Sequence, residues 1–219
     1  TIMAVDVNFD NIALAVFSRG GEMLKVKRFK TPLRKVLTHR IWIERIQRRY
    51  PESWRFIKGV GRAIKKHGGR ARNIAFNYAY KLGNLVAGLA DEHGSVIVLE
   101  NLKKVREDAK KTRSFNKRLS LWFYRRIAFA VEYKALEKGL ETAYVNPRGT
   151  SSKCPRCGAR LVEADYRVLK CRKCGFEGDR DAIACMNLFI RYSRCGGPGV
   201  PPNAPEPDAG PRRDAGERR

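Results

Sequence analysis

TIMAVDVNFDNIALAVFSRGGEMLKVKRF, residues 1–29, is the stretch that decides the fold. Three runs rich in apolar and β-branched residues, at 2–7, 12–17 and 23–29, are separated by the turn signals NFDN and Gly20-Gly21. Turns this short return the chain beside the strand that it has just left. We therefore predict three antiparallel strands at the start of a sheet.

The pattern changes to helical spacing between Leu33 and about Glu92. In NIAFNYAYKLGNLVAGLADEHG the apolar residues recur every three or four positions, and Gly94 predicts the C-terminal end of the helix. The predicted apolar face consists of Ile74, Tyr78, Leu82, Leu85, Val86 and Leu89.

Strand and helix patterns then alternate along the rest of the chain. Residues 95–99 and 140–146 predict strands, whereas residues 116–138 and 182–192 predict helices. Antiparallel strands followed by strands with crossover helices predict an α/β fold, in which helices cover a mixed sheet. The last 27 residues, rich in Gly and Pro, predict a disordered tail.

The chain is strongly basic, with 46 Lys and Arg against 22 Asp and Glu and a formal net charge of +24. Seventeen of these basic residues lie between Lys25 and Arg72, alongside only Glu44 and Glu52. Such a charge indicates a nucleic-acid partner, although the basic helices could also be simple solvated faces. Candidate contacts to nucleic acid are Arg62, Lys65, Lys66, Arg70, Arg72, Lys103, Lys104, Arg148, Thr150, Ser151 and Ser152. The last four could equally belong to a plain connector between a strand and the cysteine segment.

No run of about 18 apolar residues is present, so no membrane span is expected. The first residues lack the pattern of an export signal, which predicts a cytoplasmic protein, associated with the nucleoid when it binds DNA. The chain opens without Met inside a strand pattern, as a fragment of a longer protein would.

Four of the six cysteines form two Cys-x-x-Cys pairs. Cys154 and Cys157 are separated by thirteen residues from Cys171 and Cys174, and each pair is followed by glycine. Two such pairs predict a structural zinc ribbon, with redox-active cysteine pairs as the alternative. Because four thiolates close the coordination of zinc, this ion would stabilise the loop and take no part in chemistry.

Three carboxylates stand at the ends of predicted elements. Asp6 lies in the first strand, Glu100 follows the apolar run Val96–Leu99, and Asp181 opens the last helix. Buried carboxylates are costly unless they are paired or bind metal. We expect the three to converge on Mg²⁺ or Mn²⁺, and two such ions beside a basic surface would make a nuclease. Taken singly, Asp6 could cap a turn, Glu100 could pair with a lysine, and Asp181 could cap its helix.

These segments together resemble a known family. IMAVDVNFDNIALAVF, VIVLENLKKV, YVNPRGTSSKCPRCG and CRKCGFEGDRDAIACMNL are similar to the transposon-encoded TnpB family, relatives of the type V CRISPR effector nucleases. The resemblance implies a RuvC-like nuclease with an RNase H-like fold, helical insertions and an inserted zinc ribbon. It also implies RNA-guided cleavage of DNA, with a guide RNA and a target DNA as partners.

The resemblance implies a role for each of the three acids and a set of domain boundaries along the chain. Asp6, Glu100 and Asp181 would be the catalytic metal ligands, with Asn187 completing the Asp-x-x-Ala-x-x-Asn pattern and Asp179 as the fallback for the third acid. The expected parts are a nuclease core (1–149), a zinc ribbon (150–178), a third nuclease motif (179–192) and the tail (193–219).

The chain departs from the family pattern at two points. It begins at the first catalytic strand, without the N-terminal part that grips guide RNA in the family, and Asn8 replaces the usual glycine near the first acid. The alternative hypothesis is a catalytically silent protein that binds guide RNA or DNA, either a repressor or an RNA-binding zinc-ribbon module. The complete set of three acids favours the nuclease.

Overall fold

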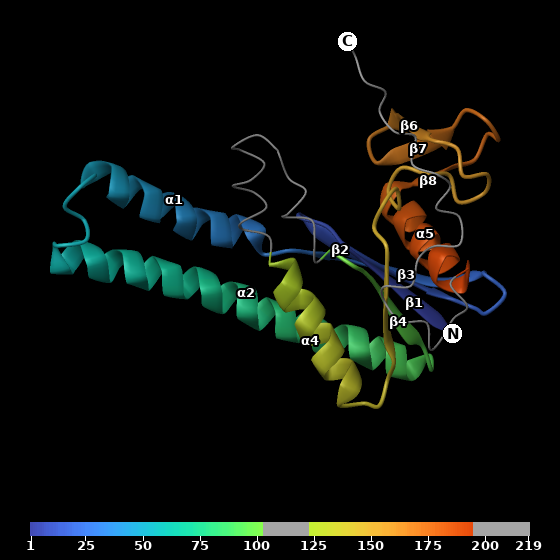
Figure 1. Ribbon diagram of the computed structural model, residues 1–219, viewed down its shortest axis with the longest axis horizontal. Coiled ribbons are helices and arrows are strands. Elements are labelled where there is room, and N and C mark those ends of the chain that lie inside the picture. Colours follow the sequence, from blue (N-terminus) through green and yellow to red (C-terminus); the bar gives the residue numbers. More distant parts are fainter. Residues whose placement is uncertain (103–122, 195–219) are drawn as a thin grey trace, which may run out of the picture.

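The structure is a computed structural model, and it describes residues 1–102 and 123–194 (Figure 1). The predictions for Lys103 and Lys104, for the start of the helix at 116–138, and for the chain after residue 194 lie outside these residues.

A five-stranded mixed sheet forms the centre of the fold. Its strands are β1 (Ile2–Val7), β2 (Asn11–Phe17), β3 (Met23–Lys30), β4 (Val96–Glu100) and β5 (Thr142–Val145). Their order is β3-β2-β1-β4-β5, in which β1, β2 and β3 are antiparallel neighbours while β4 and β5 run parallel to β1. The predicted α/β fold with a mixed sheet is thus confirmed.

Helices cover both faces of this sheet (Figure 1). On one face lie α2 (Lys58–Glu92) and α4 (Tyr124–Leu136), and on the other lies α5 (Arg180–Arg194). The helix α1 (Leu33–Arg49) packs along α2, and the two form a hairpin whose connecting end projects away from the sheet. Among the described helices, none combines the length and apolar character needed to span a membrane.

Successive side chains of a strand point to opposite faces of the sheet, so the two faces carry different residues. Val5 and Leu14 pack in the core toward α2 and α4, whereas Ala4, Ala13 and Ala15 pack toward α5. Because side chains alternate along a strand, Asp6 lies on the same face as Ala4. The small alanines allow α5 to approach the sheet closely at the end where the acid stands.

The helix α2 differs from the prediction in length and in its buried face. It is one helix of 35 residues that begins at Lys58, and it ends before Gly94, whose φ of 54° confirms the predicted stop. Leu85, which we placed on the apolar face, is 38% exposed. The buried stripe instead passes through the small residues Ala79 and Gly83, which let α4 pack closely.

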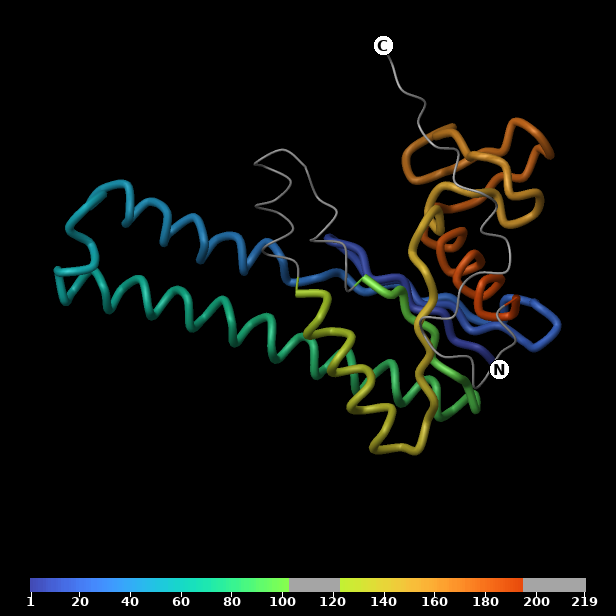
Figure 2. The backbone as a smooth tube through the Cα atoms, in the orientation of Figure 1, coloured from blue at the N-terminus to red at the C-terminus, as the bar shows by residue number. Residues whose placement is uncertain are grey.

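A second sheet of three strands holds the cysteine segment. Its strands β6 (Leu161–Asp165), β7 (Val168–Cys171) and β8 (Glu177–Asp179) are antiparallel neighbours, and β8 leads directly into α5. Figure 2 shows this sheet at the end of α5 where that helix begins. The helix α5 runs to Arg194, two residues into the segment predicted as the tail.

Candidate functional site

Asp6 and Glu100 lie at the same end of neighbouring parallel strands, Asp6 as the penultimate residue of β1 and Glu100 as the last residue of β4. The register of β1 and β4 pairs Val5 with Leu99, so the next residues on the two strands are the two acids. The residues two positions earlier, Ala4 and Val98, both pack toward α5, and the alternation of strands places the acids on that same face. Both are buried, with 6% of Asp6 and 8% of Glu100 exposed.

The third acid, Asp181, lies in the first turn of α5 and is 2% exposed. Burial is the main cause that raises the pKa of Asp6 to about 7, and the negative charges of Glu100 and Asp181 add to it. A hydrogen bond of 2.5 Å from Asn8 Nδ2 to Asp6 Oδ2 opposes the shift. Burial also raises the pKa of Glu100. Three acids from distant parts of the sequence therefore share one buried region and act on one another electrostatically.

The carboxylate of Asp181 is neutralised by two arginines. Arg28 Nε on the edge strand β3 lies 3.0 Å from Asp181 Oδ2, and Arg167 in the turn between β6 and β7 pairs with the same oxygen. Asn11 Nδ2 also donates a hydrogen bond of 2.6 Å to this oxygen. Neither arginine was predicted as part of the site, because both come from segments with no metal-binding pattern.

Asp179, the fallback for the third acid, has a different place. Its Oδ1 accepts hydrogen bonds from the backbone N–H groups of Asp181 at 2.9 Å and Ala182 at 3.2 Å, and it also pairs with Arg28. These bonds satisfy the first N–H groups of α5, which is the role of an N-cap. The helix-capping role considered for Asp181 therefore belongs to Asp179.

Glu100 is supported by the connector between β5 and the cysteine segment. Thr150 Oγ1 donates a hydrogen bond of 2.5 Å to Glu100 Oε1, and the Tyr124 hydroxyl donates to the Glu100 backbone carbonyl. Thr150 is 3% exposed, so its predicted place among phosphate contacts is wrong, because its side chain faces inward. Arg148, Ser151 and Ser152, on the same connector, are exposed.

Asp6 and Glu100 offer buried carboxylate oxygens, the type of ligand that suits a hard divalent cation. Across residues 1–102 and 123–194, the three carboxylates do not come as close together as the four cysteines, whose ligand atoms all lie within 4.8 Å of one another. The three contacts to Asp181 described above all use Oδ2. A cation bridging all three acids would therefore use Asp181 Oδ1 or displace an arginine.

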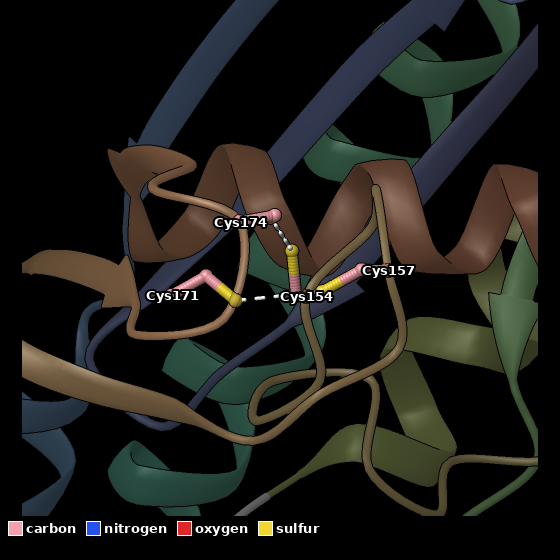
Figure 3. A group of neighbouring side chains, drawn as sticks. All are labelled: Cys154, Cys157, Cys171 and Cys174. Atoms are coloured by element: carbon pink, nitrogen blue, oxygen red, sulfur yellow. Dashed lines mark hydrogen bonds between the residues drawn. The ribbon is translucent and has the colours of Figure 1, made fainter.

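The four cysteines converge as their spacing predicts (Figure 3). The Sγ atoms of Cys154 and Cys174 are 3.6 Å apart, and those of Cys157 and Cys171 are 3.5 Å apart. Zinc bonded to four sulfurs at about 2.3 Å requires sulfurs about 3.8 Å apart, so this cluster fits tetrahedral zinc.

The backbone around the sulfurs also suits an ion. Gly158 and Gly175 have φ angles of 72° and 71°, the left-handed conformation that glycine adopts without strain. Backbone hydrogen bonds from Cys174 and Lys173 help to lower the pKa of Cys171 to about 6. At Cys171 the thiolate form, which binds metal, is thereby favoured.

The predicted nucleic-acid contacts on α2 are all exposed. They lie on the part of the helix that forms the projecting hairpin with α1 (Figure 1): Arg62, Lys65, Lys66, Arg70 and Arg72. Between the two helices, His39 Nδ1 and His67 Nδ1 are 3.0 Å apart. Their distance of 28 residues in the chain gave no ligand pattern, and only the packing of the hairpin brings them together.

Comparisons with known proteins bear on this arrangement. The chain is 32% identical over 198 residues to a TnpB-like protein of Methanocaldococcus jannaschii, a match that covers 89% of this chain and 70% of that relative. The chain belongs to the TnpB family. This TnpB chain also matches the model of the Cas12f1-like TNB domain over residues 124–188. The resemblance stated from the sequence is confirmed.

Relatives among CRISPR nucleases are more distant. A CRISPR-associated endodeoxyribonuclease Cas12f2 of a Micrarchaeota archaeon is 25% identical over 207 residues, and this TnpB chain covers 36% of it.

Two solved Cas12f structures have the same fold. A cryo-EM structure of a Cas12f1-sgRNA-target DNA complex has a TM-score of 0.58 and one of a CRISPR-Cas12f ternary complex has 0.60, both at 20% identity and over 85% of this TnpB chain. The chain spans 49% and 38% of the length of those two proteins.

Proposed function

We propose that this chain is the catalytic part of a metal-dependent DNA endonuclease of the TnpB type, associated with a transposable element and RNA-guided in its intact form. Asp6, Glu100 and Asp181 come from β1, β4 and α5 and share one buried region at the end of the sheet, where burial and mutual repulsion raise the pKa of Asp6 to about 7. Such a cluster lowers its free energy when it binds a divalent cation.

The roles of the residues follow from their surroundings. Mg²⁺ or Mn²⁺ bound as a pair would supply an activated water and stabilise the departing oxygen of a phosphodiester. Asp6 and Glu100 would hold the metal directly, and Asp181 would contribute Oδ1 while its Oδ2 stays bonded to Asn11. Arg28 and Arg167, beside Asp181, would place positive charge near the phosphate.

The partners proposed are a guide RNA and a target DNA. The exposed basic residues of α2 would follow a sugar-phosphate backbone, and the exposed Arg148, Ser151 and Ser152 would contact phosphates near the acid cluster. Support for these partners comes from the Cas12f complexes with sgRNA and target DNA that share the fold. We propose that the protein acts in the cytoplasm, on the nucleoid. The four cysteines would hold a structural zinc ion.

The test compares cleavage of labelled DNA by the protein, purified with the RNA that it retains, in the presence of Mg²⁺. Wild type is compared with Asp6→Ala and with Glu163→Ala, which removes an exposed acid on β6. We expect Asp6→Ala to abolish cleavage and Glu163→Ala to leave it unchanged. Equal products from wild type and Asp6→Ala would refute the proposal.

A second candidate is a catalytically silent protein that binds guide RNA or DNA. The pairing of Asp181 with two arginines favours this candidate, since it already neutralises one of the three acids. A silent protein would retain RNA equally in wild type and Asp6→Ala and would produce no cleavage in either. The same experiment therefore distinguishes the two functions.

A further inference from the structure

A series of buried polar groups links the cysteine cluster to Glu100. Asn187 on α5 donates both hydrogens of its side-chain amide, one to the Thr150 carbonyl at 2.7 Å and one to the Lys153 carbonyl at 2.8 Å. The Thr150 hydroxyl donates in turn to Glu100 Oε1 at 2.5 Å. Thr150, Asn187 and Glu100 are all less than 9% exposed, so water does not compete for these bonds.

The Thr150 hydroxyl has one hydrogen and two acceptors within reach. Glu100 Oε1 lies at 2.5 Å and the Pro147 carbonyl at 3.0 Å. An ionised carboxylate is the stronger acceptor, so the hydrogen is directed to Glu100. This bond fixes one oxygen of the Glu100 carboxylate.

Asn187 determines where Thr150 stands. Its two bonds hold both ends of the segment 150–153, and Lys153 directly precedes Cys154, the first cysteine of the cluster. The same segment is tied to the ribbon by the bond from Leu161 N–H to the Ser152 carbonyl at 2.9 Å. A shift of the ribbon would therefore move Thr150, and with it the carboxylate of Glu100.

We propose that Thr150 and Asn187 are positioning residues for Glu100, and that they make its orientation depend on the folded cysteine ribbon. Neither residue would touch the metal or the substrate. The inference rests on the proposed function, because it takes Glu100 as a metal ligand. It adds that the ribbon acts on the acid cluster through one amide and one hydroxyl.

The test measures binding of Mn²⁺ to the zinc-loaded protein, from the electron paramagnetic resonance signal of free Mn²⁺. Thr150→Val, which keeps the shape of the side chain and removes the hydroxyl, should weaken Mn²⁺ binding about 10-fold, as loss of an outer-shell partner does. Thr150→Ser, which keeps the hydroxyl, should restore affinity to within about 2-fold of wild type. Thr38→Val on α1 is the matched control and should have no effect.

A second variant tests the coupling to the ribbon. Asn187→Ala should also weaken Mn²⁺ binding, and its effect should not add to that of Thr150→Val, because both act through the same bond to Glu100. Removal of zinc should reduce the Mn²⁺ affinity of wild type by a larger factor than it reduces the Mn²⁺ affinity of Thr150→Val. Additive losses, or equal sensitivity of the two proteins to zinc removal, would overturn the coupling.

Glu100→Gln separates this inference from the proposed function. If Glu100→Gln weakens Mn²⁺ binding while Thr150→Val matches wild type, the positioning role is wrong and the metal site stands. If Glu100→Gln also binds Mn²⁺ as wild type does, the positioning role of Thr150 and the metal-binding role of Glu100 are both wrong. Should Thr150→Val fail to fold, the same comparison is made between Asn187→Ala and wild type.

Discussion

Asp179 Oδ1 accepts a hydrogen bond of 2.9 Å from the backbone N–H of Asp181, so the two acids of one short motif have different structural roles. Asp179 caps α5, whereas the side chain of Asp181 is buried beside Asp6 and Glu100. We expect Asp181→Asn to reduce DNA cleavage by more than about 100-fold, beyond the loss typical of outer-shell changes, while the protein stays folded. Initial rates with excess Mg²⁺ measure this.

Asp179→Ala should show the opposite pattern. Loss of the cap should lower the free energy of unfolding by about 1 kcal/mol, with a smaller effect on cleavage than Asp181→Asn. Urea denaturation and cleavage rates, measured on both variants, provide the comparison. The assignment is reversed if Asp179→Ala is the variant that loses cleavage while its stability is unchanged.

The raised pKa of Asp6 predicts that stability depends on pH when no divalent metal is bound. The folded protein holds the proton of Asp6 up to a pH of about 7, whereas the ordinary pKa of 3.8 applies when the chain is unfolded. The folded state therefore binds more protons between these values, and its stability falls as the pH rises from about 4 to about 7. The loss attributed to Asp6 is on the order of 2–4 kcal/mol.

Asp6→Asn isolates this contribution. Urea denaturation at pH 5 and pH 8, in buffer stripped of Mg²⁺ while the cysteine cluster keeps zinc, should show a smaller loss of stability in Asp6→Asn than in wild type. Added Mg²⁺ should restore the stability of wild type at pH 8 and have less effect on the variant. Parallel pH profiles for the two proteins would show that Asp6 is not the group responsible.

Gly83 marks the closest contact between α2 and α4. A Cβ at this position would lie 2.6 Å from the Ala130 carbonyl oxygen, whereas a Cβ at Gly88 on the same helix would meet nothing within 4 Å. Gly83→Ala should therefore lower the free energy of unfolding by about 1–3 kcal/mol through overpacking. Gly88→Ala should raise it by about 0.5–1 kcal/mol, because alanine favours the helix. Thermal unfolding of the two variants tests the packing, and a stabilising Gly83→Ala would contradict it.

Zinc content tests the cysteine cluster. Wild type should bind one zinc ion per chain, as four converging thiolates require. Cys171→Ser should lose the ion and unfold at a lower temperature, because binding of the metal stabilises the folded ribbon. Cys185→Ala, which alters a buried cysteine of α5, should keep its zinc. Atomic absorption of the purified proteins measures the content; zinc retained in full by Cys171→Ser would exclude the four-cysteine site.

The exposed basic residues of α2 should contribute to RNA binding in proportion to their number. Replacement of Lys65 or Lys66 by Gln should weaken binding. It should also reduce the slope of log K against log salt concentration by about 0.7 for each phosphate of a single strand that is no longer neutralised. Lys138→Gln, at a lysine already paired with Asp91, is the control. Filter binding over a salt series gives the slopes, and unchanged slopes in the α2 variants would indicate a solvated face.

Local patterns were sufficient to predict several parts of this protein. The strands β1, β2 and β3 followed from runs rich in apolar and β-branched residues with short turns between them. The convergence of four cysteines followed from two Cys-x-x-Cys pairs with thirteen residues between them. These features depend on neighbours close in sequence, whose geometry the backbone limits to a few conformations. Leu85 was misplaced because the face that α2 buries depends on where α4 crosses it.

The acid cluster shows most clearly which features the sequence determined and which depend on the tertiary structure. The sequence by itself determined that Asp6, Glu100 and Asp181 stand near the ends of elements. A stretch of about ten residues is enough to recognise a carboxylate beside an apolar run. Only the tertiary structure decided that Arg28 and Arg167 neutralise Asp181 and that Thr150 holds Glu100. These partners come from a sheet edge, a ribbon turn and a connector, and contacts between such distant segments form only when the whole core packs.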